Sequence, residues 1–160
     1  MTDRRAWEAA DTGAWQAERT LHQGRRSEVV RVGDGQGGTA LLKRLRDARA
    51  DPAAVARLRR EFDLARRLDP ALILCPQALI EHERRPALVL PDFGGETLRH
   101  RIARGTLDNE ELLRIALDLI TGLQHLHGHG LIHRNLGPGK ILLLPGAGRE
   151  PGRVLIADLG

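Results

Sequence analysis

The residues whose types suggest chemistry gather in one stretch, LIHRNLGPGKILLL at positions 131–144. At its centre stands Asn135, whose amide can orient a hydroxyl group but has no basic lone pair to accept its proton. Lys140 follows, and its ammonium group repels a metal cation instead of ligating it. The stretch therefore offers hydrogen bonding and positive charge where a reaction at a hydroxyl group would need a general base.

Two other readings of this neighbourhood are weaker. Residues 137–140, GPGK, superficially resemble a phosphate-binding loop, but Arg134 stands at the position of its first glycine and Ile141 where Ser or Thr is required. The alternating histidines of HLHGHG, residues 125–130, suggest a metal site. Because they fall at the end of a helical pattern, we favour a structural role for them.

Composition limits the possible functions. The chain has 160 residues, of which 41% are hydrophobic, enough for one compact domain or two small lobes. Aromatic residues make up 2%, so stacking platforms for single-stranded nucleic acid are missing. The net charge of +4 leaves a polyanionic partner open, but the arginines alternate with acidic residues, as in 57–61, which indicates solvated helix surface.

The cysteine content and the N-terminus predict a cytoplasmic protein. Cys75 is the single cysteine and lies in an apolar run, so we expect a buried thiol and no disulfide within the chain. The N-terminus lacks an apolar stretch of signal-peptide length, and no window approaches the length of a membrane span.

The first half of the chain predicts a β-rich unit with one helix. The runs SEVVRV and TALLKRL flank a glycine-rich turn and predict a hairpin, and ALIEH with PALVL predicts another. Between them, Asp51 and Pro52 begin a helical pattern that ends at residues 69–70. Glu61 falls at the side of the apolar arc of this helix. A carboxylate there requires a cation from the element against which the helix packs.

The second half predicts mainly helix. Residues 91–95, PDFGG, break the β pattern, and a capping box at 108–111 precedes a long helical pattern. Apolar residues cover more than one face of this helix, which predicts a central, buried position. The expected organisation is an N-terminal segment at 1–19, a first lobe at 20–93 and a second lobe at 94–160.

The order of these parts resembles the catalytic core of the protein kinase family, in which a His-Arg-Asp-Leu loop precedes a β pair and an Asp-Phe-Gly metal motif. His133, Arg134 and Leu136 match the loop, Pro138 matches its usual proline, and the final DLG at 158–160 matches the metal motif. The resemblance implies an α+β, protein-kinase-like fold. It consists of an antiparallel β lobe with one packed helix and a partial, mainly helical second lobe.

Upstream residues extend the resemblance to nucleotide binding. Lys43 is similar to the third-strand lysine of the family, and Glu61 to the helix glutamate that holds this lysine against the α and β phosphates. With Asn135 they take the family's catalytic positions, and Asp158 takes its metal position. The resemblance implies nucleotide contacts at Gly24, Val29, Lys43, Leu90, Asp92, Lys140 and Leu142.

The departures from the family pattern predict an impaired enzyme. Asn135 replaces the catalytic Asp, Lys140 replaces the Asn that holds the second magnesium, and Gly137 replaces a lysine that stabilises the transferring phosphate. We therefore expect a kinase-like, ATP-binding pseudokinase of bacterial signalling with a regulatory or scaffolding role. The expected ligands are ATP and magnesium, the metal bound weakly or at a single site.

Two alternatives are an active or weakly active serine/threonine protein kinase, which transfers the ATP γ-phosphate to protein hydroxyls, and a basic nucleic-acid-binding domain. Asn135 and Lys140 argue against the first, and the ordered series of motifs against the second.

The runs LHQGRRSEVVRV and LVLPDFGGETL also resemble the kinase-like domain that opens some large bacterial signalling proteins with ATPase and histidine kinase modules. The chain ends directly after the metal motif, so we expect either a truncated product or the front part of a longer protein. The expected partners are another protein or downstream domains of the same polypeptide, with no nucleic acid and no membrane.

Overall fold

A computed structural model describes residues 15–33, 36–47, 51–146 and 152–159. The described residues divide into two compact units. The first extends to Asp63 and includes Pro76–Asp92, and the second comprises Leu64–Cys75 and the residues from Phe93 onward. Residues 64–75 thus group with the second unit, although the range expected for the first lobe includes them.

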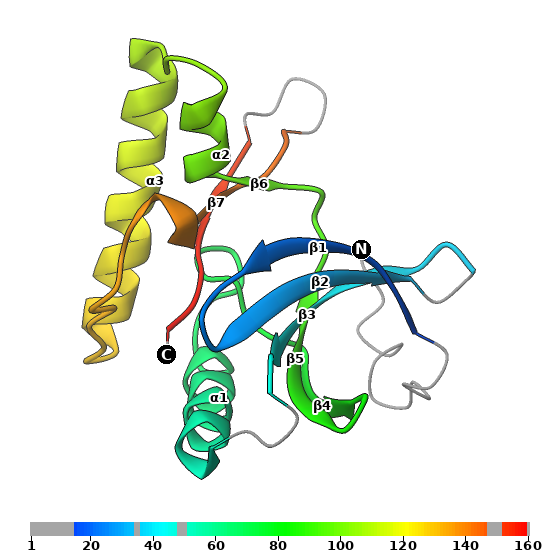
Figure 1. Ribbon diagram of the computed structural model, residues 1–160. Helices are drawn as coiled ribbons and strands as arrows, with labels where there is room; N and C mark the ends of the chain where they lie inside the picture. Colours follow the sequence, from blue (N-terminus) through cyan, green and yellow to red (C-terminus); the bar gives the residue numbers. More distant parts are fainter. Residues whose placement is uncertain (1–14, 34–35, 48–50, 147–151, 160) are drawn as a thin grey trace. The chain divides into compact units, whose positions relative to one another are not determined.

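The first unit is built on a five-stranded antiparallel sheet in the order β1-β2-β3-β5-β4 (Figure 1). Its strands are β1 Gln16–Gln23, β2 Ser27–Gly33, β3 Thr39–Leu45, β4 Ala78–His82 and β5 Arg85–Pro91. Both predicted hairpins are confirmed, as β2–β3 and β4–β5. The sequence did not predict β1, because its polar and almost wholly exposed residues lack the apolar alternation of a strand.

Alternation along the strands separates the two faces of this sheet. On one face lies a core cluster that consists of Val30, Val32, Ala40, Leu42 and Val89. On the other face, Leu45 and Leu88 pack against Leu58 of helix α1, Pro52–Ala65. The helix begins where predicted, since the Asp51 side chain accepts a hydrogen bond from the backbone N–H of Ala53 at 3.0 Å. Odd-numbered residues of β3 therefore face α1.

The second unit combines helices with a small sheet. It contains the helices α2, Leu98–Ala103, and α3, Asn109–Gly128, and the three-stranded antiparallel sheet β6-β7-β8 (Figure 1). The strands are β6 Glu96–Thr97, β7 Ile141–Leu143 and β8 Val154–Ile156, and a 3-10 turn, η2, occupies Pro138–Lys140.

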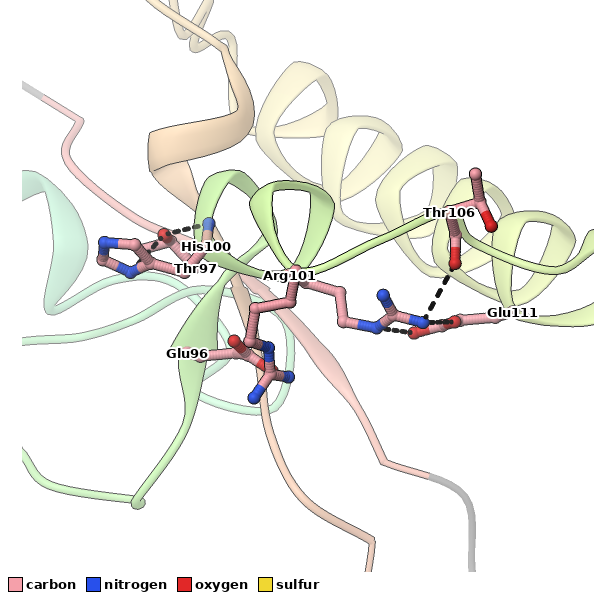
Figure 2. Close-up of polar contacts among 7 residues, drawn as sticks. Glu96, Thr97, His100, Arg101, Thr106 and Glu111 are labelled. Atoms are coloured by element: carbon pink, nitrogen blue, oxygen red, sulfur yellow. Dashed lines mark hydrogen bonds and ion pairs between the residues drawn. The ribbon is translucent and has the colours of Figure 1, made fainter.

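Helix caps and one ion pair fix the two helices of this unit. Thr97 caps α2 by accepting from the His100 N–H, and Asp108 caps α3 by accepting from the Glu111 N–H at 2.8 Å. Figure 2 shows Arg101 of α2 reaching the Glu111 carboxylate of α3, with contacts of 2.9 and 2.6 Å. This bidentate pair ties α2 to α3.

Helix α3 is buried on one face only. Its inner face contains Ile115, Gly122 and Leu126, and a Cβ at Gly122 would lie 2.9 Å from Ile156 Cδ1, so the glycine permits close packing on β8. Leu113 and Leu117 on another face are each 65% exposed. The predicted central, buried position is therefore wrong for the second apolar face of this helix, which is exposed in the described part of the chain. No helix among the described residues is long and apolar enough to cross a membrane.

Candidate functional site

The centre of the candidate site in the first unit is the ion pair between Lys43 and Glu61. The Lys43 Nζ lies 2.8 Å from Glu61 Oε1 and 2.6 Å from Oε2. Strand alternation points Lys43 toward α1, and Glu61 occupies the side of the apolar arc that packs on β3. The predicted contact is confirmed, and it supplies the cation that the buried carboxylate requires.

This pair is well shielded from water. The side chains of Lys43 and Glu61 are 13% and 9% exposed. Removing two charges from water is unfavourable, and the ammonium offsets this only by hydrogen bonding to both carboxylate oxygens at short distance. The lysine is consequently held at a defined point on the sheet.

Several predicted nucleotide-binding residues share the sheet face of Lys43. Val29 lies directly opposite Lys43 across the β2–β3 pair, and Leu90 lies opposite Leu41 across β3–β5. Cross-strand partners point to the same side of a sheet, so one face of the first unit presents apolar side chains beside the ammonium group. Gly24, before β2, forms a tight turn in which its N–H donates to the Ser27 carbonyl at 2.9 Å.

Asp92 has a partner that the sequence did not indicate. Its Oδ1 accepts a hydrogen bond from Arg31 Nη2 at 3.1 Å, and its Oδ2 forms an ion pair with Arg31 Nε at 2.6 Å. The Asp92 side chain is therefore engaged within the first unit. The two residues are distant in sequence, so spacing gave no signal of this contact.

In the second unit, His133 braces the loop that contains Asn135. The His133 Nε2 lies 3.0 Å from the Ala157 carbonyl, and the backbone N–H of Asn135 lies 3.3 Å from His133 Nδ1. One neutral tautomer, with the proton on Nε2, satisfies both contacts. The Nε2 contact connects the loop to Ala157, the residue after β8, which is the structural role expected for His133. Asn135 itself is exposed.

Lys140 and Asp158 form the second lysine–carboxylate pair. The Lys140 Nζ donates to Asp158 Oδ2, and the two side chains are 28% and 19% exposed. Pairing of Ile141 with Ile156 sets the register that brings these neighbours together. Sequence reasoning assigned both residues to metal positions of the family without predicting that they touch. Leu142 lies further along β7, opposite Leu155. Gly160 of the metal motif falls outside the described residues.

These residues do not fit a pair of magnesium ions. Magnesium takes oxygen ligands in an octahedral arrangement, whereas Lys140 presents an ammonium group and occupies an oxygen of Asp158. Among the described residues, no group of three His, Cys, Asp or Glu side chains could hold a metal ion. His125 instead accepts the Asp69 backbone N–H at 3.0 Å, which supports the structural role expected for the histidines.

Cys75 is a half-buried thiol that packs against the hydrophobic core of the second unit. Its Sγ lies 3.2 Å from the Ala65 carbonyl, and burial, with a smaller contribution from the nearby charge of Asp69, raises the pKa of Cys75 to about 11. A thiol with such a pKa is a weak nucleophile at neutral pH, so we assign it to packing.

Comparisons with known sequences agree on one family. The family described as "Protein kinase domain" matches residues 15–160. CBL-interacting protein kinase 16 of Oryza sativa subsp. japonica is 27% identical over 151 residues, which cover 92% of this chain and 32% of the relative. The probable serine/threonine-protein kinase PknB of Bifidobacterium longum is 29% identical over 160 residues, covering 92% of this chain and 22% of the relative. The chain thus spans about a third or less of these curated relatives.

Solved structures give the same result for the fold. The crystal structure of the Mycobacterium tuberculosis PknI kinase domain matches with a TM-score of 0.69 at 26% identity, covering 94% of this chain and 63% of that one. A double mutant of the same domain matches with a TM-score of 0.71 at 26% identity. The predicted protein-kinase-like fold, with an antiparallel sheet and one packed helix in its first part, is confirmed.

Proposed function

The chain belongs to the protein kinase family, and from this premise we propose that it is a nucleotide-binding pseudokinase domain with little or no phosphoryl transfer. The observation that carries the proposal is the bidentate Lys43–Glu61 pair, which in this family orients the lysine toward the α and β phosphates. The apolar positions Val29 and Leu90 on the same sheet face suit a nucleotide base.

The loss of transfer follows from the loop in the second unit. A positioned general base contributes roughly 10²–10⁴-fold to a proton transfer, and the Asn135 amide cannot act as one. Lys140 removes a metal ligand in addition. The alternative of a weakly active serine/threonine kinase has the names of the relatives in its favour, but Asn135 and Lys140 argue against it.

A domain that binds nucleotide without turnover suits a regulatory or scaffolding role in bacterial signalling. The proposed partner is another protein or a further domain of the same polypeptide. The low aromatic content and the interleaved charges argue against a nucleic acid. We place this activity in the cytoplasm, where ATP is abundant.

A transfer assay with labelled ATP tests the proposal. The purified chain is incubated with γ-labelled ATP, magnesium and a general protein acceptor, and we expect no incorporation above that of Lys43→Met. Binding is measured in parallel by thermal shift, in which ATP raises the melting temperature of the chain and not that of Lys43→Met. Incorporation that depends on Lys43 would contradict the proposed impairment, and a chain that is folded but unaffected by ATP would contradict nucleotide binding.

A further inference from the structure

Lys140 stands at the sequence position where the family has an Asn that holds the second magnesium, and its ammonium group pairs with Asp158. We propose that Lys140, held by Asp158, is a built-in cation, so that this chain binds the polyphosphate of a nucleotide without a divalent metal ion. The inference rests on the proposed function and specifies its ligand as the metal-free nucleotide.

The backbone on both sides of Lys140 is fixed. The Lys140 N–H donates to the Gly137 carbonyl at 2.8 Å, and its own carbonyl accepts the Ala157 N–H at 2.8 Å. The next residue, Ile141, begins β7 and pairs with Ile156 of β8. The backbone of Lys140 is thus anchored on both sides, and the contact with Asp158 restrains the end of its flexible side chain.

The ammonium group has capacity beyond the contact with Asp158. A lysine carries three N–H donors, and among the described residues Asp158 is the acceptor found for one of them. With the Lys140 side chain 28% exposed, the remaining donors are accessible to phosphate oxygens. The pair is therefore open on one side, unlike a closed structural salt bridge.

Asp158 becomes a positioning residue in this arrangement. Its carboxylate is neutralised by Lys140, and a divalent ion approaching the same oxygens would be repelled by the ammonium group. Asp158 also adopts a backbone φ of +69°, a conformation that Asp tolerates better than most residues. Its side chain thus holds the lysine and does not supply a metal ligand.

The first test measures ATP affinity by calorimetric titration of the whole chain, once in EDTA and once in excess magnesium. We expect the two dissociation constants to agree within about threefold. In Lys140→Asn, which restores the family's residue, binding in EDTA should weaken by on the order of tenfold and recover when magnesium is added. Lys140→Arg retains the charge and should remain independent of metal.

The outcomes separate this inference from the proposed function. If the chain binds ATP only with magnesium, Lys140 is not the cation and the inference is overturned, while nucleotide binding stands. If a folded chain binds ATP under neither condition, both are overturned. Lys140→Gln, a neutral residue of similar reach, repeats the test if Lys140→Asn does not fold.

A second test uses the metal alone. Mn²⁺ is titrated into the nucleotide-free chain and the free ion is followed by electron paramagnetic resonance. We expect no Mn²⁺ binding to the natural chain, because the ammonium group of Lys140 pairs with Asp158 and repels a divalent ion. One Mn²⁺ bound by the natural chain and lost in Asp158→Asn would overturn the assignment, since Asp158 would then be a metal ligand.

Discussion

The pair Lys43–Glu61 in the first unit and the pair Lys140–Asp158 in the second have the same chemistry in different surroundings. The first joins a central strand to a helix, with side chains 13% and 9% exposed. The second joins the residue before β7 to a residue that follows β8, at one end of this antiparallel pair, with side chains 28% and 19% exposed. Burial makes the first a structural element that also directs a lysine, whereas partial exposure leaves the second ammonium able to meet a ligand.

The largest expected effect is on the first unit. Glu61→Ala removes the partner of a shielded ammonium, and we expect a loss of about 3 kcal/mol in the free energy of unfolding. Urea denaturation followed by tryptophan fluorescence measures the change, since Trp15, one of the two tryptophans, packs on the core of this unit. Asp63→Ala, on an exposed position of the same helix, is the matched control and should change little. A loss no larger than that of the control would show that the pair is not structural.

A smaller effect is expected in the second unit. Asp158→Asn keeps a residue that tolerates the positive φ, and it removes only the charge of the carboxylate. Because the pair is more exposed, we expect a loss of about 1 kcal/mol. Urea denaturation followed by far-UV circular dichroism, to which the long helix α3 contributes strongly, measures it. A loss equal to that of Glu61→Ala would erase the distinction between the pairs.

Salt should sharpen the same distinction. At an ionic strength of about 1 M the screening length falls to about 3 Å, which weakens exposed ion pairs far more than buried ones. The destabilisation caused by Asp158→Asn should therefore shrink in high salt, while that caused by Glu61→Ala should persist. The measurement is the pair of denaturation curves at low and high sodium chloride, and equal screening of both variants would contradict the burial argument.

Alkaline pH produces the smallest effect, and it arises outside both pairs. The pKa of Cys75 rises from 9.0 to about 11 in the folded chain, so between these pH values the thiol loses its proton when the chain unfolds. The stability that Cys75 contributes is complete below pH 9.0 and declines as the pH rises toward about 11. Cys75→Ser should flatten this decline in the second unit. An unchanged slope would mean that the thiol does not titrate as its burial requires.

The parts of the fold that the sequence predicted are those with a strong pattern. Glu61 on an apolar arc required a cation, and the resemblance to the kinase family identified Lys43 as its partner, so the first pair was predictable. The polar strand β1 was missed, because its order comes from pairing with β2 and not from its own side chains. The exposed face of α3 was mistaken for core, since a sequence shows that a face is apolar but not what covers it.

The second pair and the Arg31–Asp92 contact were beyond sequence reasoning for a different reason. The Lys140 contact depends on the register of β7 against β8, which places Ile141 opposite Ile156. Shifting that register by a single residue would turn the side chains to the other face. Contacts of this kind are set by the three-dimensional pairing of strands, and the residue types alone indicate only that both groups are charged.

The central claim, that the chain holds ATP intact, is tested most directly by co-elution. The chain is incubated with γ-labelled ATP, with and without magnesium, and passed through a gel-filtration column, and the label in the protein fraction is identified by thin-layer chromatography. The account predicts that the label elutes with the protein as intact ATP in both conditions and is absent with Lys43→Met. Label attached covalently to the protein, label released as free phosphate, or a protein fraction without label would contradict it.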